Sequence, residues 1–171
     1  PSARLAPAFP GDLPPIWNVP FPPNPHFTGR QGALDELRER LASQSTAAIT
    51  QPQAVHGLGG VGKTQLAVEY AWRHRADYEA VLWAGADSPE NLAANLAALA
   101  RPELLNHPEA TATEQPVQTR SVMRWLRQHR RWLLILDCAD SPEAAAAVRQ
   151  LLSPPLPGRV IVTSRRAEWP L

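Results

Sequence analysis

A glycine-rich segment that ends in a lysine and a hydroxyl residue is the strongest chemical signal in this chain. Residues 57–64 read GLGGVGKT and satisfy the pattern G-x-x-x-x-G-K-[ST]. Glycines adopt backbone angles closed to other residues, so successive N–H groups can point inward and surround phosphate oxygens at a helix N-terminus. In such a loop Lys63 reaches the β and γ phosphates of a nucleotide, and the Thr64 hydroxyl holds Mg²⁺. The segment therefore predicts a phosphate-binding loop.

The identity of Lys63 supports this interpretation. It is the only lysine among 17 Lys and Arg residues, so every other cationic side chain is an arginine. An ammonium group is a compact point charge, whereas a guanidinium is a planar fork. We infer that this position was chosen for its chemistry.

A second interpretation of the same letters is a dinucleotide-binding turn. Gly57, Gly59 and Gly62 also satisfy G-x-G-x-x-G, a pattern that is weak without further support. Three acids, Asp77, Glu79 and Asp87, are candidates for the carboxylate that binds a ribose in that fold. A dinucleotide turn does not use a lysine followed by a threonine, and a purely structural glycine turn needs neither. The phosphate-binding loop is the favoured prediction.

An acid that ends a hydrophobic run completes the predicted site. Residues 132–136 are apolar and Asp137 follows them, which is typical of a buried parallel strand. An acid in that position, about 70 residues beyond the loop, suits the second contact of a nucleotide-bound Mg²⁺ ion. The alternative is a carboxylate that only caps the next turn.

The elements that must position these residues alternate between helices and strands. Residues 28–31 offer a Thr-x-x-Gln capping box for a helix near 29–43, and short extended runs at 47–50 and 54–56 lead into the glycine loop. Further helices are predicted near 63–74, 88–99, 116–129 and 141–152, and further strands near 79–84, 132–137 and 160–163. This alternation predicts an α/β fold with a mainly parallel sheet.

The first 25 residues differ in composition from the rest. They hold nine of the 19 prolines, so we expect little ladder hydrogen bonding and predict a linker or arm over 1–25. Residues 26–171 are the predicted nucleotide-binding unit.

Charge and cysteine content exclude several other classes. The net charge is +1, which disfavours a nucleic-acid partner, and the arginines of segment 116–131 fit a solvated helix face. The single cysteine, Cys138, fits a reducing, cytoplasmic setting, and no apolar run approaches the length that crosses a bilayer.

Four segments in order make the resemblance specific. FTGR at 27–30, GLGGVGKT at 57–64, LLILD at 133–137 and GRVIVTSR at 158–165 together resemble the NB-ARC branch of the STAND ATPases. These are switches of plant resistance proteins, apoptosome proteins and many actinobacterial regulators. The resemblance implies a P-loop NTPase three-layer sandwich, truncated after the sensor strand. It also implies that the strand bearing Thr163 lies between the phosphate-loop strand and the Asp137 strand.

The resemblance also assigns site residues and cofactors. It implies ATP or ADP with Mg²⁺, the metal being held by Thr64 and Asp137. The sensor arginine, Arg165, would contact the γ phosphate, unless Arg165 and Arg166 are only a solvated pair. The residues implied to contact nucleotide are Phe27, Thr28, Gly29, Arg30, Gly57, Leu58, Gly59, Gly60, Val61, Gly62, Lys63, Thr64, Gln65 and Arg165. The alternative for Phe27 is packing against its own helix.

Two departures from the family pattern bear on activity. Cys138 stands where many relatives have a second acid or an asparagine, and Asp140 is the nearest substitute for a general base. With Lys63, Asp137 and Arg165, Asp140 completes the candidate catalytic set, and hydrolysis is expected to be slow or negligible. The family's C-terminal helical and winged-helix segments are also expected to be absent.

The predicted function is a nucleotide-state switch that gates oligomerisation and effector output in a longer parent chain with effector and repeat domains, in bacterial defence or transcriptional control. No membrane partner is expected. The alternatives are a metabolic P-loop phosphotransferase, and a P-loop fold kept as an interaction module with weak nucleotide binding.

Overall fold

The computed structural model of this chain describes residues 13–50, 61–166 and 169. Within these residues a parallel sheet has the strand order β1-β3-β4-β5-β2. The strands are β1 (Ile16–Trp17), β2 (Thr46–Ile49), β3 (Ala80–Gly85), β4 (Trp132–Asp137) and β5 (Arg159–Thr163). β5 lies between β2 and β4, as the resemblance implied, and the predicted α/β fold class is confirmed.

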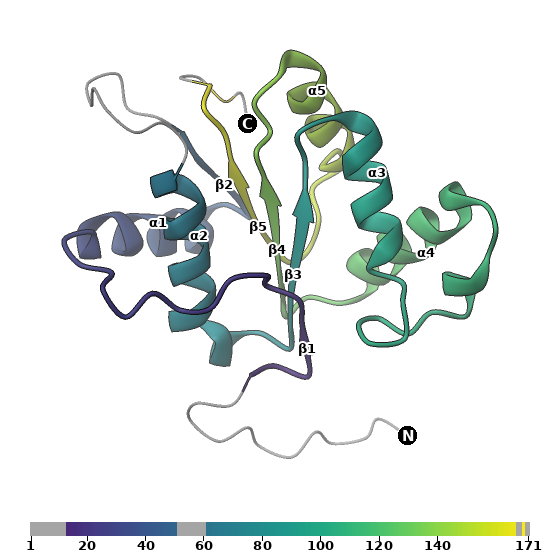
Figure 1. Cartoon of the computed structure of the whole chain (residues 1–171), viewed down its shortest axis with the longest axis horizontal. Helices are drawn as coiled ribbons and strands as arrows, with labels where there is room; N and C mark the ends of the chain where they lie inside the picture. Colours follow the sequence, from purple (N-terminus) through teal and green to yellow (C-terminus); the bar gives the residue numbers. More distant parts are fainter. Residues whose placement is uncertain (1–12, 51–60, 167–168, 170–171) are drawn as a thin grey trace.

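Helices cover both faces of the sheet (Figure 1). Helices α1 (Gln31–Ser43) and α2 (Val61–Arg73) lie on one face, and α3 (Pro89–Ala98), α4 (Gln115–Gln128) and α5 (Pro142–Leu151) lie on the other. Two short 3₁₀ helices, η1 (Arg75–Asp77) and η2 (Pro108–Thr111), connect elements. The arrangement is a three-layer sandwich.

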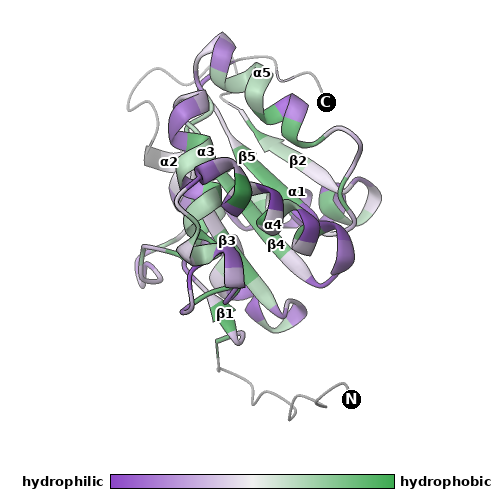
Figure 2. Ribbon diagram, turned by 90° about the vertical axis from the view of Figure 1, so that its right-hand side faces the viewer, coloured by the Kyte–Doolittle hydropathy of each residue, from purple (hydrophilic) through white to green (hydrophobic). Residues whose placement is uncertain are grey.

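The alternation of side chains along β4 explains the two layers. Leu133 and Ile135 belong to the core shared with α1 and α2, whereas Trp132, Leu134 and Leu136 belong to the core shared with α3, α4 and α5. All five are fully buried. A central parallel strand is therefore apolar throughout rather than alternating with polar residues. Figure 2 shows the strands β3, β4 and β5 largely green, whereas much of α4 is purple.

Serine side chains cap the starts of two helices. The side chains of Ser88 and Ser141 accept hydrogen bonds from backbone N–H groups at the starts of α3 and α5, and a proline follows each serine. The capping box expected at 28–31 is not formed: Arg30 is the N-cap of α1 and makes no side-chain cap bond. The preceding residue, Gly29, has φ +80°, which turns the chain before Thr28 can reach the helix.

The structure adds a strand to the segment in which prolines predicted little ladder bonding. Ile16 pairs with Ala80 and Trp17 with Val81 of β3. Asn18 then continues the pairing with its side chain: its amide donates to the Trp83 carbonyl (3.1 Å) and accepts from the Trp83 N–H (2.6 Å). A side-chain amide offers both a donor and an acceptor, so it replaces the backbone groups of a longer strand.

The parallel direction of the strands brings their carboxyl ends to one edge of the sheet, next to the start of α2. This is the edge at which ligands bind in open α/β sheets. The run 54–56 and loop residues 57–60 lie outside the described residues. In the described part of the chain, no helix is long and apolar enough to cross a membrane.

Candidate functional site

The site is organised around the carboxylate of Asp137 at the end of β4. Thr64, on the first turn of α2, donates its hydroxyl to Asp137 Oδ1 at 2.9 Å. Thr163, at the end of β5, donates its hydroxyl to the same oxygen at 2.6 Å. Three elements that are distant in sequence therefore meet at one carboxylate oxygen.

Thr163 is the residue of this cluster that sequence reasoning placed on a strand without giving it a role. Its side chain is buried, and its hydroxyl oxygen also accepts the Cys138 N–H at 2.9 Å. Cys138 has φ +67°, an uncommon value for a residue other than glycine, and the hydroxyl holds this turn in place. The signal that could have found Thr163 is a hydroxyl residue that ends a Val-Ile-Val run.

The thiol of Cys138 cannot serve as the general base that an acid at this position would supply. Cys138 is exposed, yet partial desolvation of its thiol, followed by the negative charge of Asp137, raises the pKa of the thiol to about 11. The thiol is therefore protonated at neutral pH and can neither accept a proton nor act as a nucleophile there.

The start of α2 carries the predicted phosphate-binding residues that the structure describes. Lys63, Thr64 and Gln65 are half-buried on the first turn of the helix. The helix N-terminus presents backbone N–H groups and a partial positive charge. Of the loop itself, Gly57, Leu58, Gly59 and Gly60 lie outside the described residues, as does the side chain of Val61.

Arg30 contacts the loop end of α2. Its Nη1 donates to the Gly62 carbonyl at 2.9 Å. A Cβ on Gly62 would lie 2.7 Å from Nη1 and 2.8 Å from Nη2 of Arg30, so a larger residue there would displace this guanidinium from its present position. The structure thus connects the 27–30 segment to the residue directly before Lys63.

Phe27 lies elsewhere along α2. The Cζ atom of Arg73 lies 5.6 Å from the centroid of the Phe27 ring. Arg73 also donates to Glu69 (2.8 Å) and to Gln31 (2.6 Å), which ties α2 to α1. Arg73 follows Lys63 by ten residues, or about 15 Å of helix. Phe27 packs on α2, while Thr28 and Gly29 are exposed.

Asp140 and Arg165 form a two-point contact at the same edge of the sheet. Asp140 Oδ1 accepts the Arg165 backbone N–H at 2.7 Å, and Oδ2 accepts Arg165 Nε at 2.8 Å. The arginine side chain is 65% exposed and that of Asp140 is 24% exposed. Both oxygens of the predicted substitute base are therefore engaged by Arg165.

The donor atoms suit a hard cation beside a polyphosphate. Mg²⁺ prefers oxygen ligands, retains several waters and is usually held by one or two protein groups together with substrate phosphates. The hydroxyl of Thr64 and the carboxylate of Asp137 are oxygen ligands of this kind and lie within 2.9 Å of each other. In the described ranges, no group of three His, Cys, Asp or Glu side chains could hold a metal alone. Such a small donor set fits an ion that arrives with its nucleotide.

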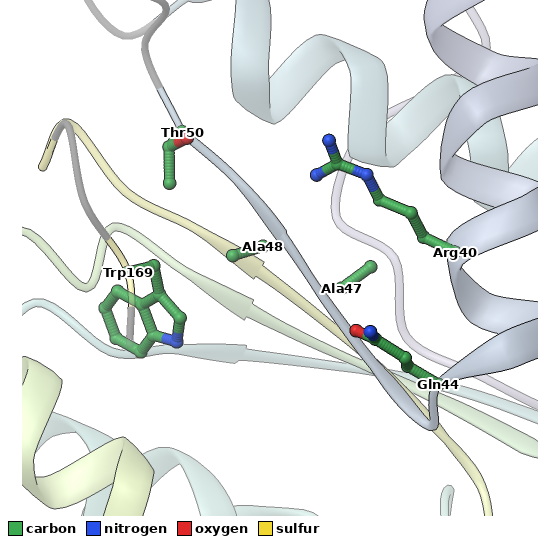
Figure 3. A pocket seen from close by; sticks show the side chains of 6 residues that line it. All are labelled: Arg40, Gln44, Ala47, Ala48, Thr50 and Trp169. Carbon is green, nitrogen blue, oxygen red and sulfur yellow. The ribbon is translucent and has the colours of Figure 1, made fainter. Parts of the chain in front are cut away.

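A separate pocket lies at β2 and does not belong to this site. It has a volume of about 260 Å³ and is lined by Arg40, Gln44, Ala47, Ala48, Thr50 and Trp169 (Figure 3). None of the predicted site residues lines it.

The fold is a three-layer α/β sandwich, and the helix after the glycine-rich segment begins beside the carboxylate at the end of β4. These two features define the chain as a P-loop NTPase. The chain belongs to the NB-ARC domain family, the nucleotide-binding modules of STAND proteins: the NB-ARC domain model matches residues 30–169.

Two curated relatives are similar over most of the chain. A nucleotide-binding leucine-rich repeat (NLR)-like protein of Hyaloscypha variabilis is 32% identical over 129 residues, which cover 72% of this chain and 13% of that protein. The regulatory protein AfsR of Streptomyces griseus is 36% identical over 150 residues, which cover 82% of this chain and 14% of that protein. The chain thus spans about one seventh of the length of either relative.

Among solved structures, the ORC2 protein of Aeropyrum pernix in its ADPNP–ADP complexes aligns with 90% of this chain and 43% of that chain. The sequence identity is 16% and the TM-score is 0.48, so nothing about function follows from this likeness.

Proposed function

We propose that this chain binds ATP or ADP together with Mg²⁺ and acts as the nucleotide-dependent switch of a longer STAND protein, with the third phosphate gating oligomerisation and effector activation. The observation that carries the proposal is the contact of Thr64 with Asp137 at the start of α2. It brings the two predicted metal ligands together at the helix terminus where phosphates dock. A regulatory protein among the relatives supports a signalling role.

Each residue has a proposed task. Lys63 neutralises the β and γ phosphate oxygens, and the loop and α2 N–H groups bind them. Thr64 and Asp137 hold Mg²⁺, which when bound neutralises charge on the same oxygens. Segment 27–30 lines the base side, with Phe27 anchoring it on α2, and Arg165 contacts the γ phosphate.

Slow or negligible hydrolysis follows from the groups beside Asp137. A general base must be free to accept a proton from the attacking water. The Cys138 thiol is already protonated at neutral pH, and both oxygens of Asp140 accept hydrogen bonds from Arg165. The site therefore favours binding a nucleotide over hydrolysing it. We further propose a reducing, cytoplasmic setting, with neither nucleic acid nor a membrane as a partner.

The test is the substitution Lys63→Ala, with Arg149→Ala on the exposed face of α5 as the matched control. A nucleotide at about 100 times its dissociation constant stabilises the parent chain by roughly 2.7 kcal/mol, which is visible as a melting shift. We expect the shift in the parent and the Arg149 variant and its loss in the Lys63 variant.

Equal binding by the Lys63 variant and the parent would show that the loop assignment is wrong. Steady phosphate transfer to a small acceptor would identify a phosphotransferase instead. Silence of the parent toward both ADP and ATP analogues at millimolar concentration would identify an interaction module.

A further inference from the structure

We propose that Asp140 is a positioning residue that orients Arg165 for the third phosphate of a bound nucleoside triphosphate, so that the Asp140–Arg165 pair sets the preference of the site for ATP over ADP. This inference rests on the proposed function, because it assigns a partner to the arginine of that site. It replaces the role of a substitute base that the sequence suggested for Asp140.

The contact uses one edge of the guanidinium. One Asp140 oxygen accepts a hydrogen bond from the Arg165 backbone N–H, and the other accepts one from Nε of Arg165. A guanidinium has five N–H donors in a rigid fork, and four of them belong to Nη1 and Nη2. Asp140 leaves both Nη nitrogens available to a second anion, and a pair of parallel N–H groups matches phosphate oxygens.

The placement of the pair connects it to the predicted phosphates. Arg165 lies two residues beyond Thr163, and Asp140 lies three residues beyond Asp137, at adjacent strand ends. Thr163 and Asp137 are themselves joined at 2.6 Å. Further bonds fix the short segments between them: the Ala139 N–H donates to the Thr163 carbonyl (3.0 Å) and the Ser164 hydroxyl donates to the Ala139 carbonyl (2.7 Å). These bonds fix the position of Arg165 relative to Asp137, the proposed metal ligand.

Orientation matters here because the arginine side chain is 65% exposed. An unrestrained arginine samples many rotamers, and ordering one on binding costs free energy. The Asp140 carboxylate restrains the Arg165 side chain at Nε before a nucleotide binds. Less side-chain entropy is therefore lost when the guanidinium contacts the phosphate. ADP lacks the third phosphate and gains nothing from this arrangement.

The experiment measures dissociation constants of ADP and of a non-hydrolysable ATP analogue, each with Mg²⁺, by calorimetry on the full chain. The variants are Asp140→Ala, Asp140→Asn, Arg165→Ala and the double variant of Asp140→Ala with Arg165→Ala. The change Asp140→Asn keeps an acceptor for the Arg165 backbone N–H but removes the charged contact with Nε, so this variant separates the turn from the orientation. Glu143→Gln is the control, because it removes a negative charge from an exposed side chain in the first turn of α5.

We expect Asp140→Ala and Asp140→Asn to lower the ratio of ATP-analogue affinity to ADP affinity by roughly tenfold, with ADP affinity unchanged. The double variant should match Arg165→Ala, because residues that act through one contact are not additive. Glu143→Gln should stay within about twofold of the parent.

Three results would overturn the inference. An unchanged or raised ratio in both Asp140 variants, with a lowered ratio in Arg165→Ala, removes the positioning role and leaves the proposed function standing. An unchanged ratio in Arg165→Ala removes the phosphate contact as well, although nucleotide binding stands. Absence of binding by the parent removes both the proposed function and this inference.

Discussion

One oxygen of Asp137 accepts hydrogen bonds from two hydroxyl groups, and the two donors differ in burial. Thr64 is half-buried at the start of α2, whereas Thr163 is 2% exposed and belongs to the interior. In the proposed function, the Thr64 hydroxyl would become a metal ligand when Mg²⁺ and a nucleotide bind. The Thr163 hydroxyl bond holds the Asp137 carboxylate in a fixed orientation without the Thr64 bond.

We therefore predict that Thr163→Val, which has nearly the same shape, costs about 1–3 kcal/mol of stability, because the Cys138 N–H loses its acceptor inside the protein. Asp137 also loses its fixed orientation, so Mg²⁺-dependent nucleotide affinity should fall. Urea unfolding measures the first effect, and nucleotide titration at several Mg²⁺ concentrations measures the second. A Thr163→Ser variant, which keeps the hydroxyl, should recover most of the affinity.

The raised pKa of Cys138 predicts a pH dependence of its reactivity. Only the thiolate reacts with iodoacetamide, and the folded thiol is half ionised at about pH 11 rather than near the ordinary value of about 8.5. At pH 8 the nucleotide-free chain should react roughly tenfold or more slowly than the urea-unfolded chain, and its rate should rise with pH toward 11. Rates that are equal in the two states at pH 8 would contradict the assigned environment of this thiol.

At the scale of elements, the packing of β4 against the turn before β5 is the tightest contact at a glycine among the described residues. Trp132 is fully buried, and its indole N–H donates to the carbonyls of Leu126 (3.1 Å) and His129 (2.9 Å). A Cβ on Gly158 would overlap the indole ring, which these bonds hold in place. The close approach of this turn to Trp132 sets where β5 begins. It therefore also sets the position of Thr163, the last residue of β5.

Gly158→Ala should therefore destabilise the chain by about 1–3 kcal/mol through overpacking. Gly32→Ala on α1 is the matched control, because its Cβ would meet no atom within 4 Å, and alanine there should be neutral or stabilising by up to about 1 kcal/mol. Chemical denaturation of both variants gives the comparison. Equal stability of the Gly158 variant and the parent would mean that the Trp132 ring can move aside.

The elements also show which parts of the site could be predicted from the sequence. Asp137 could be predicted because an acid after an apolar run is visible in the local sequence, and the place of β5 between β2 and β4 followed from the resemblance. The role of Thr163 could not be predicted from the sequence, because its hydrogen bond to Asp137 depends on the register of β4 against β5. Strand β1 was missed because prolines dominate its segment, while the side chain of Asn18 supplies the pairing that backbone groups would supply elsewhere.

At the scale of the whole molecule, the segment 13–25 is joined to the core by aromatic contacts. The Trp17 and Trp72 rings pack edge to face at 4.8 Å, and Phe21 packs on Trp83 at 5.6 Å. The Trp72 indole also donates to the Phe21 carbonyl at 3.0 Å. The first unit proposed from composition, 1–25, thus contributes side chains to the second.

We predict that a chain beginning at residue 26 is less stable than the parent by several kcal/mol, on the order of 2–4, because it loses these aromatic contacts and exposes one edge of β3. A chain beginning at residue 13 keeps every one of these contacts and is the reference for the comparison. Thermal and urea unfolding of the two truncated chains provide the comparison. Equal stability of both would show that residues 13–25 are a linker after all.

The solitary ε-amino group of this protein sits on the first turn of α2, half-buried and within a regular helix. A lysine-specific endoproteinase accordingly has a single bond to cut in this chain, and we expect cleavage to require unwinding of the start of α2. The digestion rate would then measure local opening at the start of α2, without any label or engineered residue.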